Sequence, residues 1–173
     1  MCYHLSLTRA RDYLEGRFQA RFEDPTRFVP RYHLSAFTAP SHPVIANDDS
    51  GVIRMFRWGL VPSWVKDEAT AKRLRLGNLN ARAETIHEKR SFRRAIQKRR
   101  CLVLVDGFYE WRLEGGKKYP YYIQLASHEA FALAMVPQGR QRIAQRFIAG
   151  WGGPRGKVPP GRERVEGAAS RDG

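Results

Sequence analysis

The sequence predicts an α+β fold in which mixed or antiparallel β-sheets are flanked by a few helices. Three observations point to this class. Short apolar and aromatic runs typical of strands alternate with polar turns, two stretches show helical periodicity, and adjacent glycines separate two of the runs as in a hairpin. The chain has 173 residues, of which 42% are hydrophobic and 12% aromatic, and this is enough for one domain with a core.

At least two helices are expected. Residues 9–22 are assigned to the first, because Tyr13, Leu14 and Phe18 fall near one face of such a helix. Residues 92–99 are assigned to the second, and Ser91 precedes them as a candidate N-cap.

Four strands are expected from the apolar and aromatic runs. They are Val44–Ala46, Gly51–Trp58, Cys101–Trp111 and Tyr119–Leu125. The segment Cys101–Val105 is continuously apolar, which is typical of a strand buried on both faces, and Asp106 and Gly107 end it. Gly115 and Gly116 are expected to turn a hairpin.

The composition changes after residue 135. The last 38 residues contain eight glycines, four prolines and seven arginines and show no sustained apolar pattern. Such a segment is either solvated disorder or a basic tail that adds nonspecific affinity for nucleic acid. The sequence therefore predicts a domain over residues 1–135 and a disordered tail over residues 136–173.

The charge favours a polyanionic partner. The net charge is +14, and residues 1–135 alone hold 23 basic and 14 acidic residues. No signal peptide or membrane span is evident, and the two cysteines, Cys2 and Cys101, form no disulfide framework. These features predict a cytoplasmic protein without a membrane partner. The five histidines are scattered, so no metal or cofactor is expected.

Cys2 has the most distinctive chemistry. Removal of Met1 would leave an N-terminal cysteine whose α-amine and thiol lie on adjacent carbons. An α-amine with an ordinary pKa of about 7.7–8 is partly neutral near pH 7 and condenses with an aldehyde to an imine. The thiol then closes a five-membered thiazolidine, a second covalent bond that a lysine imine lacks. The alternative is a buried cysteine that acts only as a small hydrophobic residue.

Four segments together resemble the SOS response-associated peptidase (SRAP) family over about residues 2–135. They are Met1-Cys2, the octapeptide RWGLVPSW at residues 57–64, the hexapeptide NARAET at residues 80–85 and the undecapeptide CLVLVDGFYEW at residues 101–111. The resemblance implies a barrel-like core of mixed sheets, here incomplete at the C-terminus. It also implies a monomeric sensor that crosslinks to abasic sites in single-stranded DNA through a thiazolidine at Cys2, with peptidase and lyase activities attributed to the family.

The resemblance assigns catalytic roles to three residues. Cys2 matches the nucleophile. Asn80 matches an asparagine of the pocket, where an amide can donate to a developing oxyanion, although a turn-capping asparagine is the alternative. Glu110 matches the catalytic glutamate, which takes and returns protons, whereas a glutamate at a strand end would otherwise be a surface charge.

Arg82, Trp58 and Trp64 are the candidates for DNA binding. Arg82 resembles the arginine that binds the phosphates flanking the lesion, a task that suits a guanidinium. The two tryptophans belong to the segment that lies beside the DNA in the family, where an exposed indole stacks on a base. Trp58 also fits the core, and Trp64 is the better surface candidate. The basic run Lys89–Arg100 either tracks phosphates or is a solvated helix face.

Two departures from the family are visible. The chain reads Cys2-Tyr3-His4 where many members read Cys-Gly-Arg. The family also continues past residues 131–134 into further strands and a histidine motif of the type His-x-Arg-Met-Pro, which is absent from this sequence. The shift to Gly, Arg and Pro is what a change of reading frame would produce. Without the histidine motif, adduct formation is expected to be slow and poorly reversible.

Two other functions stay open. Cys2 would serve an autoproteolytic N-terminal-nucleophile peptidase, although only Met1 precedes it in the sequence. The chain would otherwise be a noncatalytic basic module that binds single-stranded DNA. Retention of Met1 after mutation of Glu110 would favour the first, and equal binding of intact and abasic strands without an adduct would favour the second.

Overall fold

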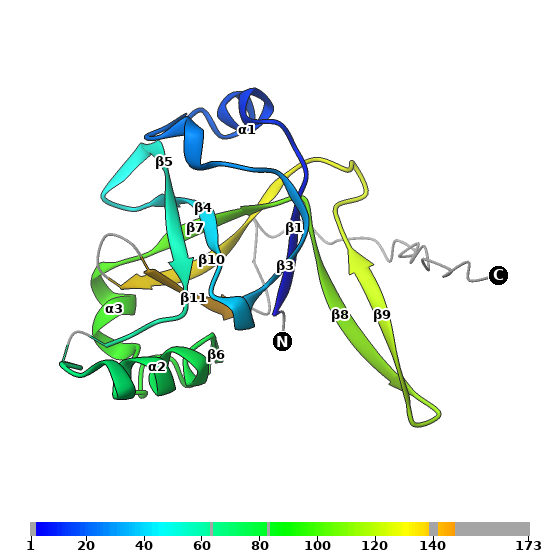
Figure 1. The fold of residues 1–173 in the computed structure, drawn as a ribbon. Helices are drawn as coiled ribbons and strands as arrows, with labels where there is room; N and C mark the ends of the chain where they lie inside the picture. The colour runs from blue at the N-terminus through cyan, green and yellow to red at the C-terminus, as the bar shows by residue number, and fades with distance from the viewer. Residues whose placement is uncertain (1–2, 63, 83, 139–141, 148–173) are drawn as a thin grey trace.

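The computed structural model describes residues 3–62, 64–82, 84–138 and 142–147, with side chains up to residue 136 (Figure 1). The helices are α1 (Arg11–Phe18), α2 (Glu68–Gly77) and α3 (Arg93–Lys98), with short 3₁₀ turns at Pro25–Arg27 and Ala36–Thr38. The strands are β1 (His4–Leu7), β2 (Arg21–Phe22), β3 (Arg31–Ser35), β4 (Ser41–Ala46), β5 (Asp49–Trp58), β6 (Asn80–Arg82), β7 (Cys101–Val105), β8 (Gly107–Glu114), β9 (Lys117–Ile123), β10 (Phe131–Gln138) and β11 (Arg142–Phe147).

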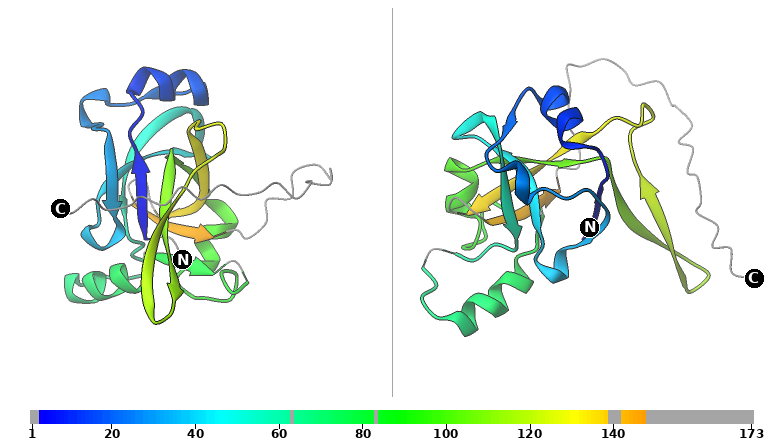
Figure 2. Two further views of the ribbon diagram at one scale, coloured as in Figure 1. Left: turned by 90° about the vertical axis from the view of Figure 1, so that its right-hand side faces the viewer. Right: turned by 45° about the horizontal axis from the view of Figure 1, so that its top comes forward.

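The strands form two mixed sheets. One has the order β3-β1-β8-β9, and the other has the order β2-β5-β4-β7-β10-β11-β6. Most neighbours are antiparallel, and the parallel pairs are β2 with β5 and β11 with both β5 and β6. The β8–β9 hairpin projects from the rest of the molecule (Figures 1 and 2).

The predicted mixed sheets with few helices are observed, but the barrel-like core is not confirmed. The chain forms two sheets, and the described contact between β11 and β5 extends over only two residue pairs, Arg142↔Arg57 and Ile143↔Trp58. Closure into a barrel requires a continuous hydrogen-bonded circumference.

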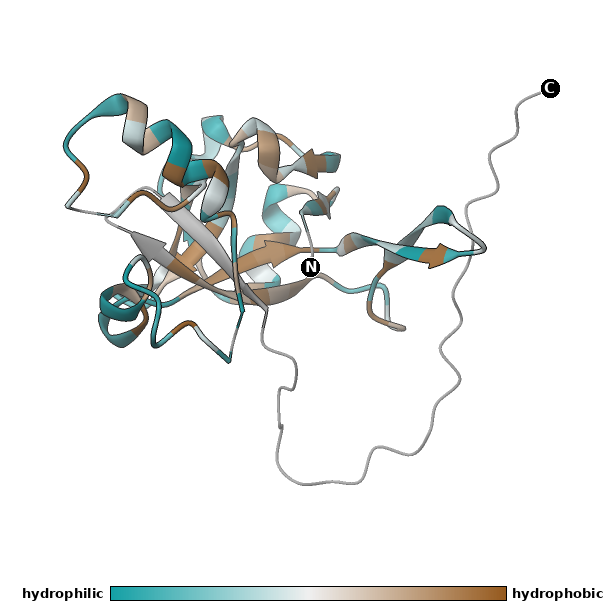
Figure 3. Cartoon of the chain, turned by 90° about the horizontal axis from the view of Figure 1, so that it is seen from below, coloured by the Kyte–Doolittle hydropathy of each residue, from teal (hydrophilic) through white to brown (hydrophobic). Residues whose placement is uncertain are grey.

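Apolar clusters cover both faces of the seven-stranded sheet. Successive residues of a strand point to opposite faces, so they belong to different clusters. Val44 and Val103 pack in a cluster with Trp58, whereas Ile45 and Leu104 pack on the opposite face in a cluster that includes Leu14 of α1. A third cluster covers α3 and contains the buried residues Leu60, Ala81, Ile86, Phe92, Ile96 and Val136. Hydrophobic residues accordingly concentrate in the central strands (Figure 3).

The two predicted helices exist with shorter bounds. α1 covers Arg11–Phe18 within the predicted residues 9–22, because Gln19 adopts a left-handed conformation that ends it. The predicted cap at Ser91 is wrong. Phe92 is the N-cap of α3, makes no side-chain capping bond, and is held instead by its burial in the core.

Three of the four predicted strands are present with shifted bounds, and the fourth, Cys101–Trp111, is divided into β7 and β8, which belong to different sheets. Leu102 is 44% exposed, so the run Cys101–Val105 is not buried on both faces along its whole length. β7 ends before Asp106, as predicted, and β8 begins at Gly107. Gly115 and Gly116 turn the β8–β9 hairpin with φ values of 55° and 79°, the two positive values that a type I′ turn requires.

Described strands continue beyond residue 135. β10 ends at Gln138, and β11 pairs with β10 from Met135↔Gln145 to Gln138↔Arg142. The predicted tail, residues 136–173, therefore includes a paired strand of the seven-stranded sheet. Residues 148–173 lie outside the described residues, so the division into a domain and a disordered tail stays a prediction.

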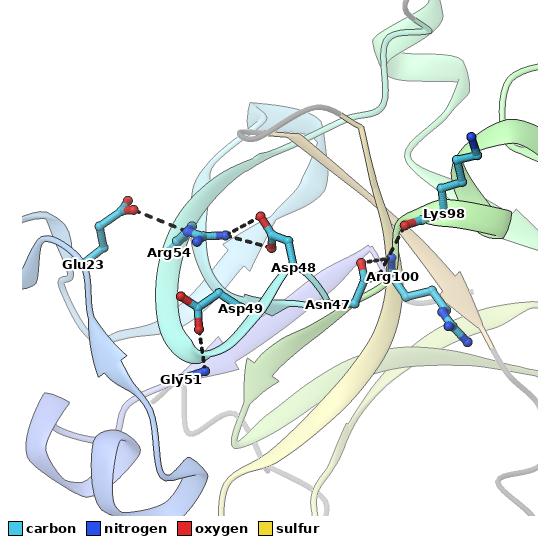
Figure 4. A network of polar contacts seen from close by, with 8 residues as sticks. All are labelled: Glu23, Asn47, Asp48, Asp49, Gly51, Arg54, Lys98 and Arg100. Atoms are coloured by element: carbon cyan, nitrogen blue, oxygen red, sulfur yellow. Dashed lines mark hydrogen bonds and ion pairs between the residues drawn. The ribbon is translucent and has the colours of Figure 1, made fainter.

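A polar network ties the β4–β5 turn to its neighbours (Figure 4). Arg54 forms ion pairs with Asp48 at 2.9 Å and with Glu23 at 3.4 Å. The Asn47 side chain accepts from the backbone N–H of Arg100 at 2.8 Å and donates to the carbonyl of Lys98 at 3.3 Å. The second set of contacts fixes the passage from α3 into β7.

His42 is a buried histidine that makes the fold sensitive to acid. Its Nε2–H donates to the carbonyl of Leu104 at 2.6 Å, and burial lowers the pKa of His42 to about 4. The unfolded chain, with a histidine pKa of about 6.5, therefore binds the proton more readily than the fold does between pH 6.5 and pH 4. This contribution to stability is present above pH 6.5 and is lost as the pH falls.

We expect the free energy of unfolding to fall by about 2 kcal/mol between pH 7 and pH 5 because of His42 alone. Urea unfolding at the two pH values measures this change. His42→Gln should remove most of the difference, whereas the exposed His87→Gln should retain it. Equal pH dependence of the wild type and His42→Gln would contradict the assignment.

Candidate functional site

The start of β1 lies against the Tyr109-Glu110-Trp111 segment of β8. The two strands are antiparallel, with His4 opposite Tyr109 and Leu5 opposite Phe108. Glu110 is half-buried, and its Oε1 atom is shielded from solvent. The register therefore brings the first described residues of the chain beside the predicted catalytic carboxylate.

Cys2 lies outside the described residues, so its predicted role stays a prediction. The other cysteine, Cys101, is buried in the core at 4% exposure. Burial raises the pKa of the Cys101 thiol, which disfavours the reactive thiolate. Of the two thiols, Cys101 is thus unsuited to nucleophilic chemistry.

Aromatic and imidazole rings surround the start of β1. The His4 ring lies edge-on to Trp111, with centroids 4.7 Å apart, and nearly parallel to His33, with centroids 5.0 Å apart. Burial is the main cause that lowers the pKa of His4, the charge of His33 lowers it further, and Glu110 raises it. His4 is therefore neutral near pH 7. Tyr109 donates its hydroxyl proton to the carbonyl of Tyr32 at 3.0 Å.

Asn80 and Arg82 lie on the other sheet, in β6. This strand pairs in parallel with β11, and its middle residue, Ala81, is buried. The alternation leaves Asn80 half-buried, with a shielded Oδ1, and Arg82 exposed. The first residue of β6, Asn80, is thus placed where its amide can line a pocket, and the last, Arg82, is placed where its cation faces solvent.

Trp58 is a core residue, which corrects its assignment to DNA binding. Its side chain is 0% exposed, and its indole N–H donates to the carbonyl of Leu79 at 3.1 Å. A base cannot stack on an indole that the core already covers. Trp58 instead supports the residue that precedes Asn80.

Trp64 lies at the surface beside α3. It is 46% exposed, and the guanidinium of Arg90 lies over its ring at 4.8 Å from the centroid. The two residues line a groove of about 180 Å³ whose other lining residues are Pro62, Ser91, Arg94, Ala95, Lys98 and Arg99. Four of the groove's eight lining residues carry a positive charge, so the predicted basic run contributes one side of an aromatic and cationic surface.

A second hollow lies elsewhere. It measures about 450 Å³ and is lined by Asp12, Glu15 and Gly16 of α1, Gln19 and Ala20 after that helix, Arg21 of β2 and Gly51 of β5. None of the predicted site residues lines it. Its mixed charges and shallow setting give no chemistry that connects it to Glu110.

Sequence reasoning missed the proximity of His4 and His33 to each other and of both to β8. The two histidines are far apart in the sequence and become neighbours because β3 pairs with β1. Both lie near β8 because β8 pairs with the other edge of β1. Within the described ranges, no group of three or more His, Cys, Asp or Glu residues is arranged to hold a metal ion. The described helices include none that is long and apolar enough to cross a membrane.

These features define a mixed-sheet α+β protein with a half-buried carboxylate beside its first strand and an exposed basic groove. The sequence profile of the SOS response associated peptidase (SRAP) family matches residues 1–146. This chain belongs to the SRAP family.

Several relatives share the matched region. The chain is 40% identical over 140 residues to abasic site processing protein YoaM of Bacillus subtilis, covering 78% of this chain and 58% of the relative. It is 41% identical over 133 residues to abasic site processing protein HMCES of Rattus norvegicus, covering 68% and 37% of the two chains. The chain thus spans about half the length of these relatives, or less.

Solved structures support the same fold. A crystal structure of a protein from Bacteroides thetaiotaomicron superposes with a TM-score of 0.72 at 38% identity, covering 78% of this chain and 59% of that protein. A protein from Bordetella bronchiseptica, at 22% identity, superposes with a TM-score of 0.65 over 84% of this chain. The second comparison supports the fold alone.

Proposed function

We propose that this protein processes abasic sites in single-stranded DNA by forming a covalent thiazolidine between Cys2 and the aldehyde of the opened sugar. One observation carries the proposal: β1 places His4 opposite Tyr109, beside Glu110. Consecutive Cα atoms are about 3.8 Å apart, so the chain limits the Cα of Cys2 to within about 7.6 Å of the His4 Cα. The names of the relatives YoaM and HMCES support abasic-site processing as the activity.

The condensation requires two proton transfers. The α-amine of Cys2 adds to the aldehyde carbon, and the resulting carbinolamine loses its oxygen as water to give an imine. The thiol sulfur then bonds to the same carbon. One proton from the amine and one from the thiol leave with the oxygen as water, so the balance needs no oxidant or reductant.

Glu110 is proposed to move these protons. Its partly shielded carboxylate can accept a proton from the amine or thiol and return it to the departing oxygen. Asn80 is proposed to donate its amide N–H to the developing oxyanion of the carbinolamine. Its position at the start of β6, next to the buried Ala81, fixes the backbone from which that amide projects.

The surface that holds the DNA is proposed to combine Arg82 with the groove between Trp64 and α3. Arg82 is exposed, and Arg90, Arg94 and Lys98 supply further cations along the groove. Single strands suit this surface, because unstacked bases can reach an indole while the backbone follows the cations. We propose that the protein binds and processes the DNA as a monomer.

The experiment that tests the proposal uses protein lacking Met1 and two single strands that differ at one position. One strand carries an abasic site, and the other carries a tetrahydrofuran analogue that has no aldehyde. An adduct that survives heat and denaturant is expected only with the first strand. Equal adduct yields with both, or none with either, would refute the proposed chemistry.

Arg82→Ala is expected to weaken binding to intact and abasic strands alike. Loss of one phosphate contact should reduce the slope of log affinity against log salt by about 0.7 for a single strand. Fluorescence anisotropy over a range of salt concentrations measures both quantities. Arg27→Ala, which removes an exposed arginine outside the proposed DNA surface, is the matched control and should change the slope less.

Asn80→Ala and Glu110→Gln should bind nearly as the wild type does and form the adduct more slowly. Comparable losses of affinity in Arg82→Ala, Asn80→Ala and Glu110→Gln would mean that the three residues act as one structural unit. The separate roles proposed above would then be wrong.

A further inference from the structure

His4 and His33 form a hydrogen-bonded pair of imidazoles. His4 Nδ1 and His33 Nε2 lie 2.9 Å apart. The ring planes differ by only 8°, and the centroid separation of 5.0 Å is close to the N···N distance plus the two ring radii. The rings therefore meet edge to edge in nearly one plane, where an N–H of one ring points at the lone pair of the other. One proton is shared between the two nitrogens.

The pair extends from the candidate active site to solvent. β1 lies between β3 and β8 in the four-stranded sheet (Figure 1). His4 is half-buried and pairs with Tyr109 of β8, whereas His33 of β3 is exposed. Because His4 is opposite Ser35, His33 is its diagonal neighbour on the same face of the sheet.

The surroundings of His4 allow it to change protonation during a reaction. The titratable groups that face it are His33 from β3 and Tyr109 and Glu110 from β8. Burial and His33 lower the pKa of His4, so the ring is neutral near pH 7 and can accept a proton. Glu110 raises that pKa and stabilises the protonated ring once it forms.

We propose that the His4–His33 pair relays protons between the reacting groups of Cys2 and bulk water. The inference rests on the proposed condensation, which must move one proton from the amine and one from the thiol. A proton binds the outer nitrogen of one ring, the shared proton crosses the 2.9 Å contact, and a proton leaves the outer nitrogen of the other ring. Both rings end neutral, so no charge accumulates beside Glu110. His4 and His33 are positioning and proton-transfer residues in this scheme.

His33→Gln separates a relay from a structural hydrogen bond. The glutamine amide can still bond to His4 Nδ1, but it cannot take up or release a proton between pH 5 and pH 8. With protein lacking Met1 and an abasic single strand, the adduct should form at least about tenfold more slowly. The dependence of the rate on pH between 5.5 and 8 should flatten. Affinity for an intact strand and the melting temperature should be unchanged, and His87→Gln is the control.

Two further measurements complete the test. Added imidazole should restore the rate of His33→Ala, because His33 is exposed and leaves an accessible site. In ¹⁵N-imidazole NMR of the wild type, the His4 and His33 titrations should be coupled, and His33→Gln should shift the His4 titration.

The outcomes distinguish the relay from the proposed function. A wild-type rate and pH profile in His33→Gln, with a normal adduct in the wild type, would overturn the relay alone. Failure of the wild type itself to form an adduct would overturn the condensation and the relay together. Independent His4 and His33 titrations would overturn the shared proton.

Discussion

Cys2→Ser in protein lacking Met1 is expected to abolish the denaturation-resistant adduct with an abasic single strand. The serine hydroxyl would have to close an oxazolidine, which is less stable than a thiazolidine, so the reversible imine would not be trapped. Chemical blocking of the α-amine should have the same effect. Denaturing electrophoresis after heating measures the adduct.

The structure supplies a matched control for this change. Cys101→Ser alters the other thiol, which is buried in the core and has a pKa raised by that burial. It should keep the adduct yield while costing some stability. Affinity of Cys2→Ser for an intact strand should equal that of the wild type. An undiminished adduct from Cys2→Ser would show that another nucleophile reacts.

The parts of the fold that were predictable are those that local signals specify. The glycine pair at residues 115–116 defines its turn because both φ values must be positive, and the apolar run before Asp106 defines β7. β1, β3 and β6 are short and carry no clean alternation, so they were not predicted. Their pairing depends on neighbours that are distant in the sequence, such as β8 for β1 and β11 for β6.

The residues of the candidate site could be predicted from the resemblance to the family, but their arrangement in space could not be predicted from the sequence. Glu110, Asn80 and Arg82 occupy exposed or half-buried positions compatible with their predicted roles, which stay predictions. The sequence favoured Trp64 over Trp58 as the surface tryptophan, because Trp64 follows Pro62 and Ser63. Burial separates them: Trp58 ends β5 inside the core, and Trp64 follows it in a surface segment.

The His4–His33 contact illustrates why the rest of the site was not predictable. Neither histidine belongs to a motif, and 28 residues separate them in the sequence. They meet only because β3 pairs with β1. Cross-strand neighbours of this kind follow from register, and register follows from the tertiary arrangement.

The Asp106 carboxylate joins the ends of three strands near the site. Thr8, just after β1, donates to it from its backbone N–H at 2.5 Å and from its hydroxyl at 2.6 Å, and Tyr122 of β9 donates its hydroxyl at 3.2 Å. Burial raises the pKa of Asp106, but the hydrogen bonds from Thr8, Ser6 and Tyr122 outweigh this and lower it overall. A Cβ on Gly107 would lie 2.3 Å from the Tyr122 ring, so glycine is needed to admit that tyrosine.

Asp106→Ala is expected to lower the free energy of unfolding by about 3–5 kcal/mol, a large part of the stability of a single domain. The change removes an acceptor that is 5% exposed and leaves the donors of Thr8, Ser6 and Tyr122 without their partner. Asp106→Asn keeps the shape and one acceptor oxygen, so it should cost less. Urea unfolding at pH 7 measures both changes.

The control is Asp12→Ala in α1, whose side chain is 82% exposed and should change stability by no more than about 0.5 kcal/mol. Tyr122→Phe removes one hydroxyl donor and also the cost of burying that hydroxyl. It should therefore lower the free energy of unfolding less than Asp106→Ala does. A double-mutant cycle between these two residues should show coupling, because the loss of Tyr122 matters less once its acceptor is gone. Stability of Asp106→Ala within 1 kcal/mol (about the error of the method) of the wild type would mean that water replaces the carboxylate without loss. The strand ends around β1 and β8 would then be held by their backbone pairing and apolar contacts alone.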